Sequence, residues 1–383
     1  MIEKVWNPDS IRDKIQRRAI QQRRPLSCTM ELTYRCNFRC KMCYIRMTDA
    51  QAAPYGRMRT VEEWLDIARQ MWDAGVLNLT LTGGECTRYP GFERLYGQLA
   101  QMGFQIAIMT NAGAYTDSIR EVFRKYPPNS AGITLYGGSN ETYEAVTGDP
   151  KGFEKTVENI RFFQSIQVPV RLTFTMIRQN VMDYPKVGKL CQELGLPYTL
   201  ITDITGHRYN VSFSDALTSR LTPAERACVA CYPAEEVIQA MAEAGKLEKE
   251  LINFRMPEAS EESGNLTQDS CIGSHTGCAI YWNGEMQTCI SLNGYHNTKP
   301  FETGFEAAWA QLKARQDETF CRPIVCRVCS MATDCLHNCA GRRFEGTGSP
   351  KEPDPYTCQY IYLLRTLRKK QGKADRNNPP QCV

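Results

Sequence analysis

The sequence predicts an α/β protein built as a partial (β/α)6 barrel with a cysteine-rich C-terminal region. Two observations carry this prediction. Between residues 27 and 205, six short runs rich in β-branched and aromatic residues alternate with amphipathic helical stretches, which is typical of parallel βαβ units. The chain also has 18 cysteines, of which three lie within Cys36–Cys43 and nine between Cys271 and Cys358.

The elements follow in a regular order along the chain. Strands are expected at 27–34, 77–82, 104–110, 131–136, 169–177 and 197–202, with helices between them. Six units are fewer than the eight of a closed barrel, so the barrel is expected to be open. The predicted organisation is a basic N-terminal extension (1–26), the barrel (27–206), a helical bridging region (207–269), a cysteine-rich domain (270–364) and a basic tail (365–383).

The composition excludes several classes of protein. A charge of +4 over 383 residues gives no indication of a nucleic-acid partner. The chain has no apolar run near ~18 residues and its first residues lack the apolar core of a secretory signal. We therefore expect no membrane association and a cytoplasmic protein, in which clustered thiols bind metal rather than form disulfides.

Unusual motifs follow four successive strands of the predicted barrel. They read CNFRCKMC after the first strand, GGEC after the second, TNAG after the third and YGGSN after the fourth. A single glycine-rich loop is an ordinary turn, but the carboxyl ends of parallel strands meet at one face, where barrel enzymes carry their chemistry. Four such loops on one face indicate a functional site.

The first motif has the spacing C-x3-C-x2-C and consists of Cys36, Cys40 and Cys43. Three thiolates can each bind a separate iron of a [4Fe–4S] cluster, and the fourth iron then stays open to another ligand. Structural zinc takes four protein ligands, and no fourth cysteine or histidine lies nearby in the sequence. A zinc site or a disulfide remains the alternative at this stage.

With Thr82-Gly83-Gly84-Glu85, this motif resembles the radical S-adenosylmethionine (SAM) superfamily over roughly residues 27–205. The resemblance implies that SAM chelates the open iron. An electron from the cluster then cleaves SAM into methionine and a 5′-deoxyadenosyl radical, which abstracts hydrogen from the substrate. Gly83, Gly84 and Glu85 are implied to hold the methionyl amine, because an ammonium group needs a carboxylate and glycines allow close backbone approach.

The same resemblance implies further contacts to SAM. Thr110, Asn111 and Thr134 lie where the family contacts the ribose or the methionine carboxylate. The family usually has an aromatic residue just before its third cysteine, whereas here Tyr44 follows it and is the candidate contact of the adenine. Cys86 follows the GGE motif directly and is the candidate catalytic residue, as a hydrogen-atom donor or a substrate contact. The alternative for Cys86 is a small buried hydrophobic residue.

The second cysteine-rich region resembles the SPASM domain, a C-terminal extension of many radical SAM enzymes. Its spacing is Cys271-x6-Cys278-x5-Gly284-x4-Cys289, then Cys326-x2-Cys329-x5-Cys335-x3-Cys339, then Cys358. The resemblance implies two auxiliary [4Fe–4S] clusters, and therefore three clusters in all. It assigns one auxiliary cluster to Cys271, Cys278, Cys289 and Cys339, and the other to Cys326, Cys329, Cys335 and Cys358. A pair of zinc knuckles fits the same number of thiols, and Cys321 could compete for a cluster.

The resemblance implies radical hydrogen abstraction under anaerobic conditions. The leading interpretation is a maturase that forms a crosslink or another oxidative modification in a ribosomally made peptide. The alternatives are an anaerobic sulfatase-maturating (formylglycine-forming) enzyme and a small-molecule radical SAM dehydrogenase. An iron–sulfur electron carrier is the non-enzymatic alternative, although a carrier has no need of the GGE motif.

The expected partners follow from the same resemblance. They are a precursor peptide and a flavodoxin- or ferredoxin-type reductant. Many peptide maturases begin with a winged-helix module that binds the leader of the peptide. Only 35 residues precede Cys36, which is too few for that fold, so leader recognition is expected to use a separate protein or another surface.

Overall fold

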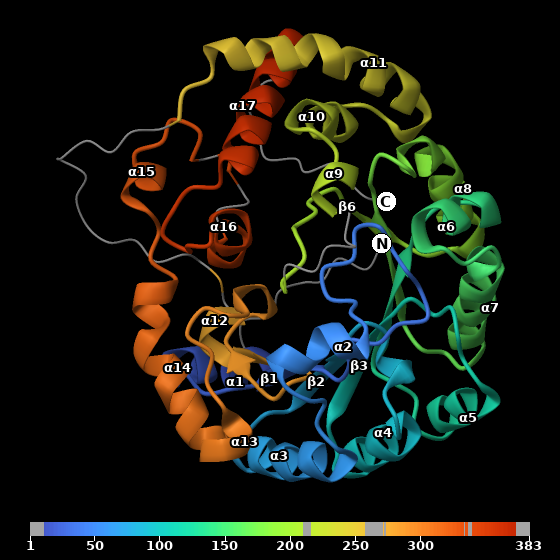
Figure 1. The fold of residues 1–383 in the computed structure, drawn as a ribbon, viewed down its shortest axis with the longest axis vertical. Coiled ribbons are helices and arrows are strands. Elements are labelled where there is room, and N and C mark those ends of the chain that lie inside the picture. The colour runs from blue at the N-terminus through green and yellow to red at the C-terminus, as the bar shows by residue number, and fades with distance from the viewer. Residues whose placement is uncertain are drawn as a thin grey trace.

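A computed structural model describes residues 11–209, 216–256, 271, 273–332, 334–335 and 339–372 of the chain. Parts of the predicted N-terminal extension (1–10), bridging region (210–215 and 257–269) and basic tail (373–383) lie outside these ranges. Helices surround a central sheet, with the N-terminal half of the chain on one side and the C-terminal third on the other (Figure 1). None of the described helices is long and apolar enough to cross a membrane.

The six expected strands all form, and they pair in parallel in chain order. They are β1 (Ser27–Glu31), β2 (Asn78–Thr82), β3 (Gln105–Thr110), β4 (Ser130–Leu135), β5 (Val170–Thr175) and β6 (Tyr198–Ile201). The register pairs Glu31 with Thr82 and Ile108 with Ala131, so the carboxyl ends of the strands meet at one edge. The predicted α/β fold with a parallel barrel sheet is confirmed.

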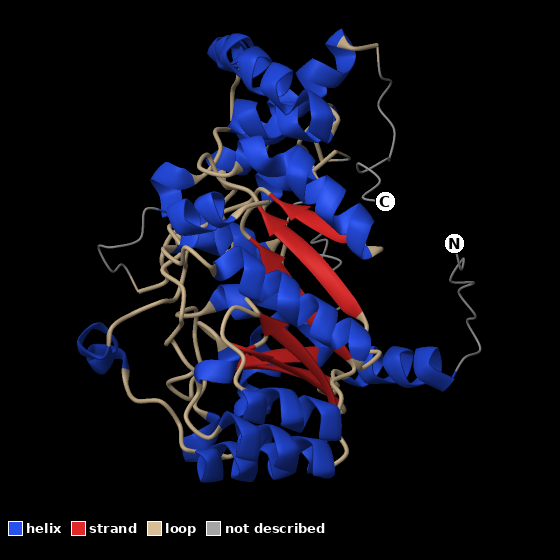
Figure 2. Ribbon diagram, turned by 90° about the vertical axis from the view of Figure 1, so that its right-hand side faces the viewer, coloured by secondary structure: helices blue, strands red, loops and turns tan. Residues whose placement is uncertain are grey.

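Amphipathic helices cover the outer face of this sheet, as Figure 2 shows. They are α3 (Val61–Asp73), α4 (Phe92–Gln101), α5 (Asp117–Lys125), α6 (Asn140–Thr147), α7 (Gly152–Ser165) and α8 (Tyr184–Leu194). Helix α3 begins at a capping box formed by Thr60 and Glu63, and it buries Trp64 and Met71 completely. Burying each such side chain contributes about 1.5–3 kcal/mol, so the outer helices supply much of the core.

The two faces of the strands differ in residue size and polarity. In β4 the residues Ala131, Ile133 and Leu135 are buried, while the alternate residues are half-buried. The alternate positions carry small or polar side chains such as Gly132 and Thr134, because successive side chains point to opposite faces. This pattern leaves the interior of the barrel open near the carboxyl ends of the strands.

The cysteine-rich region extends the barrel sheet, which the sequence did not predict. Strand β7 (Gly277–Ile280) pairs in parallel with β1, and β8 (Met286–Gln287) pairs antiparallel with β7. The sheet order is therefore β6-β5-β4-β3-β2-β1-β7-β8. Helix α14 (Phe305–Thr319) packs near α3, and the Nε1 of Trp309 donates to the carbonyl of Arg23 at 3.0 Å.

A second apolar core lies among α10 (Pro223–Cys231), α11 (Val237–Leu247) and α17 (Pro355–Lys370). It joins the bridging region to the C-terminal helix through Ala227, Leu247 and Leu364. The remaining helices are α1 (Ile11–Gln22), α2 (Asp49–Ala52), α9 (Ala216–Ser219), α12 (Gly273–Thr276), α13 (Pro300–Thr303), α15 (Ile324–Arg327) and α16 (Ala340–Thr347). Short 3-10 turns lie at Ala53–Tyr55, Cys86–Arg88, Val181–Asp183, Ala234–Glu236, Glu248–Asn253 and Ile290–Leu292.

Candidate active site

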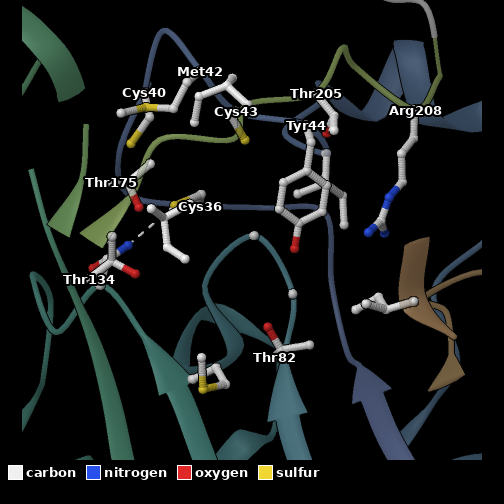
Figure 3. A pocket seen from close by; sticks show the side chains of 18 of the residues that line it. Cys36, Cys40, Met42, Cys43, Tyr44, Thr82, Thr134, Thr175, Thr205 and Arg208 are labelled. Atoms are coloured by element: carbon white, nitrogen blue, oxygen red, sulfur yellow. Dashed lines mark hydrogen bonds between the residues drawn. The ribbon is translucent and has the colours of Figure 1, made fainter. Parts of the chain in front are cut away.

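A cavity of about 370 Å³ opens at the carboxyl ends of the barrel strands. Its walls come from three parts of the chain: the cysteine loop after β1, the ends of β2 to β6, and the cysteine-rich region. Threonines at strand ends point towards the cysteine loop in Figure 3. The lining residues include Cys36, Cys40, Cys43, Tyr44, Thr82, Gly83, Gly84, Thr110, Asn111, Thr134, Thr175, Asp203, Arg208, Ser291, Arg342 and Glu345.

The structure brings the three cysteines of the first motif together on one wall of this cavity (Figure 3). Backbone amides help to orient two of the thiols: the amide of Phe38 donates to Cys36 Sγ at 3.4 Å and that of Arg46 to Cys43 Sγ at 3.2 Å. The loop is tied to the end of α6, since the amide of Arg39 donates to the carbonyl of Thr147 at 2.7 Å.

The three thiols influence one another electrostatically. Burial, with added contributions from the neighbouring Glu85 and Cys43, raises the pKa of Cys36 to about 12. Burial also raises the pKa of Cys40, with added contributions from Cys36 and Cys43. Three mutually repelling thiolates are favourable only around a cation. The loop therefore fits a metal cluster.

Within the described residues, no group of three or more His, Cys, Asp or Glu side chains is arranged to hold a single metal ion. A cubane is a different case, because each thiolate then binds a separate iron. The donor set of the loop is three cysteines facing an open cavity, and this set suits a [4Fe–4S] cluster with one iron left for SAM.

Gly83 and Gly84 let the GGE loop lie directly against the chain that leads into the cysteine motif. The amide of Gly84 donates to the carbonyl of Thr33 at 2.6 Å, and that of Glu85 to the carbonyl of Arg35 at 2.9 Å. A Cβ at Gly84 would lie 2.5 Å from the carbonyl oxygen of Arg35. Only glycine allows this close approach, so the motif fixes the position of the loop against the chain that leads into the cysteine motif.

The carboxylate of Glu85 is turned away from the cavity wall. Its side chain is 1% exposed, and it accepts hydrogen bonds from Thr87 Oγ1 and Thr110 Oγ1, both at 2.8 Å. The backbone amide of Asn111 donates to its other oxygen at 2.8 Å. Burial raises the pKa of Glu85, and these hydrogen bonds oppose the shift. In this structure Glu85 positions Thr110 and Asn111, while Thr82, Gly83 and Gly84 face the cavity.

Asn111 connects this network to the cysteine loop. Its Nδ2 donates to Cys36 Sγ at 3.4 Å and to Asn37 Oδ1 at 3.0 Å. The three predicted SAM contacts Thr110, Asn111 and Thr134 all line the cavity. A hydrogen bond to a cluster sulfur is one of the means by which proteins set a cluster's reduction potential.

Cys86 lies in the apolar core behind the cavity. Its side chain is fully buried, and its Sγ donates to the carbonyl of Met109 at 3.6 Å. Burial and the adjacent Glu85 raise the pKa of Cys86 well above that of an ordinary thiol. This position favours the packing interpretation over the role of hydrogen-atom donor.

Tyr44 lines the cavity together with a residue that the sequence did not single out. The guanidinium carbon of Arg208 lies 4.3 Å from the centroid of the Tyr44 ring, and Arg208 Nη1 donates to the buried Glu31 Oε2 at 2.9 Å. Figure 3 shows Tyr44 and Arg208 on the same side of the cavity. Glu31 ends β1, so this pair ties the loop to the sheet.

The cysteine-rich region closes the cavity with Ser291, Arg342 and Glu345. Arg342 Nη1 donates to the carbonyl of Asp203 at 3.1 Å. Burial raises the pKa of Glu345, although Arg208 and Arg342 oppose the shift. Sequence reasoning missed these residues because no motif marks them, and only the fold brings 203–208 against 342–345.

The predicted ligands of the second auxiliary cluster gather in one place. Burial raises the pKa of Cys326 to about 11, with an opposing contribution from Arg343 and added ones from Cys335 and Cys329. Burial likewise raises the pKa of Cys358 to about 12, with contributions from Cys326, Cys335 and Cys329. These four thiols therefore interact mutually, as a shared cluster requires.

The predicted ligands of the first auxiliary cluster divide into two groups. Cys339 and Cys271 both raise the pKa of Cys289, which burial brings to about 11. Cys278 instead lies on β7 beside Cys28 of β1. Cys321 accepts a hydrogen bond from Arg327 Nη2 at 3.2 Å.

Residues 30–191 match the model of the Radical SAM superfamily. The sporulation killing factor maturation protein SkfB of Bacillus subtilis is 26% identical over 171 residues, which are 45% of this chain and 40% of SkfB. The subtilosin biosynthesis protein AlbA of the same organism is 24% identical over 172 residues, which are 45% of this chain and 38% of AlbA. The chain thus matches about two fifths of the length of each of these relatives.

Another relative matches along most of its length. The AdoMet-dependent heme synthase of Methanosarcina barkeri is 24% identical over 357 residues, covering 88% of this chain and 97% of that protein. This match includes the cysteine-rich region as well as the barrel.

The fold resembles solved structures of proteins with bound S-adenosylmethionine. Streptococcus suis SuiB bound to S-adenosylmethionine matches with a TM-score of 0.61 at 17% identity, over 91% of this chain and 81% of SuiB. Native anSMEcpe with bound AdoMet matches with a TM-score of 0.60 at 16% identity, over 91% of this chain and 98% of that protein. Residues 30–191 thus match the Radical SAM superfamily in sequence, and the chain shares the fold of these solved structures.

Proposed function

We propose that the protein is a radical SAM maturase that abstracts hydrogen from a ribosomally made peptide and forms a crosslink or another oxidative modification in it. One observation carries the proposal: the three-cysteine loop, the glycines of the GGE motif and the cysteine-rich region enclose one cavity. The curated relatives SkfB and AlbA are named for the maturation of a sporulation killing factor and the biosynthesis of the bacteriocin subtilosin, and SuiB has been solved with its precursor peptide SuiA.

In this proposal Cys36, Cys40 and Cys43 hold the SAM-binding cluster, which when loaded supplies the electron that cleaves SAM. Gly83 and Gly84 offer backbone groups to the methionyl end of SAM, while Thr134 and Asn111 offer polar side chains. Tyr44 offers an aromatic face that Arg208 holds in place. Binding the cosubstrate in an enclosed cavity keeps water away from a reactive radical.

The part of the cavity lined by the cysteine-rich region is the proposed contact surface of the peptide. Glu345 lies there with a pKa that burial raises from its ordinary value, so it can take up a proton nearer neutral pH than an exposed glutamate. Oxidative crosslinking removes a proton as well as a hydrogen atom from the substrate, and Glu345 is the proposed acceptor. The two auxiliary clusters of the cysteine-rich region would take up the electron that remains.

A second candidate is a small-molecule reaction of the same radical chemistry. The specific observation that favours it is the heme synthase match, which spans 88% of this chain. A tetrapyrrole substrate would then occupy the cavity instead of a peptide, and its carboxylates would meet Arg208 and Arg342.

The experiment is anaerobic loading of the chain with iron and sulfide, followed by reduction with SAM and measurement of 5′-deoxyadenosine. We expect its formation to rise when a precursor peptide encoded beside the gene is added, and the peptide to lose two mass units per crosslink. A rise with an iron-free tetrapyrrole instead would support the second candidate. No 5′-deoxyadenosine from a fully loaded protein would refute both.

A further inference from the structure

A second cavity, of about 440 Å³, adjoins the cavity that the three cysteines of the first motif line. Residues of the segment 203–208, together with residues of the cysteine-rich region, line both cavities. Figure 3 shows two residues of that segment, Thr205 and Arg208, beside Tyr44 in the first cavity. Arg220 and Tyr356 line the second cavity and not the first. The second cavity therefore continues the first one away from the cysteine loop.

Arg220 is a cation without a counter-ion in the second cavity. The other two arginines of this cavity have carboxylate partners: Arg208 pairs with Glu31 at 2.9 Å. Arg342 Nη1 lies 3.2 Å from Asp203 Oδ2. Among the residues that the structure describes, no carboxylate forms an ion pair with the Arg220 guanidinium, and no acceptor takes a hydrogen bond from it.

The remaining carboxylates of the second cavity have other contacts. Asp354 caps α17, since its two oxygens accept hydrogen bonds from backbone amides of the first helical turn, both at 3.2 Å. Glu345 interacts electrostatically with Arg208 and Arg342. Within the described part of the cavity, the charge left uncompensated is therefore positive and lies on Arg220.

Tyr356 holds this guanidinium in place. The guanidinium carbon of Arg220 lies 3.9 Å from the centroid of the Tyr356 ring. Tyr356 is buried, and its hydroxyl donates to the carbonyl of Leu221 at 2.8 Å. A guanidinium that lies over an aromatic ring keeps the N–H groups at its edge available, and two of them match the two oxygens of a carboxylate.

We propose that Arg220 binds a carboxylate of the peptide substrate, at a position of the peptide that is not itself modified. The inference rests on the proposed function, because it presupposes a peptide whose reacting residue lies in the first cavity. That cavity of about 370 Å³ is at the small end of ligand sites, which span about 300–1,000 Å³, and SAM shares it. The neighbouring part of the peptide therefore extends into the second cavity. The carboxylate is an acidic side chain or the C-terminus of the peptide.

The first test measures modification of a precursor peptide encoded beside the gene by the loaded protein. Arg220→Met keeps an apolar side chain over Tyr356 but removes the charge and the N–H donors. We expect the KM for the peptide to rise about tenfold, as for the loss of a hydrogen bond between charged groups, with a much smaller change in kcat. If circular dichroism shows that this variant is unfolded, Arg220→Gln takes its place.

The matched control is Arg178→Met. Arg178 is exposed, pairs with Glu225 at 3.3 Å and lines neither cavity. It is a near neighbour of the site, since its backbone amide donates to the carbonyl of Ser219 at 2.9 Å. This variant should keep the wild-type KM. An equal rise of KM in the control and in the Arg220 variant would overturn the proposal, because a general loss of surface charge would then explain both.

The second test identifies the carboxylate. Each Asp and Glu of the peptide is changed in turn to its amide, and a further peptide carries a C-terminal amide, so that the two sources are distinguished. We expect one of these peptides to raise the KM of the wild-type protein about tenfold. The same peptide should cause no further rise with the Arg220 variant, because both changes remove one contact. If the two effects instead multiply for every peptide, the proposal is overturned.

The outcomes also separate this inference from the proposed function. A folded Arg220 variant that modifies the peptide with the wild-type KM would overturn the inference alone. A wild-type protein that forms 5′-deoxyadenosine but modifies no peptide would refute the proposed function, and the inference with it.

Discussion

At the residue scale, the buried pair of Arg208 and Glu31 organises one side of the cavity. Glu31 is fully buried and the Arg208 side chain is 9% exposed. Burial raises the pKa of Glu31, and the guanidinium of Arg208 opposes that shift. The two residues are 177 positions apart, and no motif marks either, so the sequence could not have paired them.

We expect Arg208→Met to lower the free energy of unfolding by about 3–5 kcal/mol, because it leaves the buried Glu31 carboxylate without its cationic partner. The double variant Arg208→Met/Glu31→Gln should recover most of this loss. The measurement is urea unfolding at neutral pH. The control is Arg57→Met, which breaks an exposed pair with Glu63 and should cost less than about 1 kcal/mol.

The pH dependence of the Arg208→Met variant has a definite sign. A carboxyl whose pKa is raised in the folded state stays protonated to a higher pH in the folded than in the unfolded protein. The free energy of unfolding therefore falls as the pH rises from the unfolded pKa through the folded pKa. The destabilisation should therefore shrink as the pH is lowered towards the usual range of a glutamate. A loss that stays constant with pH would show that packing, and not the charge of Glu31, causes it.

At the element scale, the six barrel strands were predictable because each pairs a buried hydrophobic face with small or polar residues. The threonines at the carboxyl ends of these strands also indicated the site, since Thr110 and Thr134 line the cavity as expected. Strand β7 was not predictable as a barrel strand. Ile280, Tyr281 and Trp282 are residues that favour strands, but they do not say that the partner is β1, about 250 residues earlier.

The GGE loop gives a prediction at this scale. Gly84→Ala would place a Cβ 2.5 Å from the carbonyl oxygen of Arg35 and 2.7 Å from that of Tyr34, and backbone atoms cannot move aside. We expect the loop to shift and SAM affinity to fall at least tenfold, as measured by equilibrium binding to the loaded protein.

The matched control for this variant is Gly245→Ala in α11. A Cβ there meets nothing within 4 Å, and alanine in a helix interior is favoured over glycine by about 0.5–1 kcal/mol. This variant should bind SAM normally and unfold at slightly higher urea. Unchanged SAM affinity in Gly84→Ala would contradict the role given to the loop.

At the scale of the whole molecule, residues of the barrel and of the cysteine-rich region line the same cavity. The sequence located both cysteine groups, because their spacing is local. It could not locate Ser291, Arg342 and Glu345 on the shared wall, since that depends on how β7 joins the sheet. From spacing, the sequence also predicted Cys278 as a ligand of the first auxiliary cluster. In the structure the side chain of Cys278 lies in the apolar core, because of its orientation on β7.

Changing Cys36, Cys40 and Cys43 together to Ala should abolish SAM cleavage and remove about four irons per chain. The reason is that the SAM-binding cluster has its proposed ligands only in this loop, whereas the auxiliary cysteines are more than 225 residues later in the chain. Iron analysis and 5′-deoxyadenosine formation are the measurements. SAM cleavage that persists in this variant would refute the assignment of the site.

Changing Cys329 or Cys335 should separate SAM cleavage from turnover of the substrate. Both thiols act on Cys326 and Cys358, and both side chains pack against the helical core of α10, α11 and α17, away from the SAM cavity. We expect each variant to lose an auxiliary cluster but still to form 5′-deoxyadenosine with an artificial reductant. Modified peptide should not accumulate, because the electron left on the substrate has lost its acceptor.

The competing outcome for these variants is loss of the fold, since a cluster with four thiolates also contributes to stability. Far-ultraviolet circular dichroism and SAM affinity distinguish the two cases, because a folded variant keeps both. Cys228→Ala is the control: this buried thiol lies in the same core and is not a proposed ligand, so it should keep its iron and its turnover. A folded Cys329 variant that lacks the cluster yet modifies peptide at the wild-type rate would show that this cluster is structural.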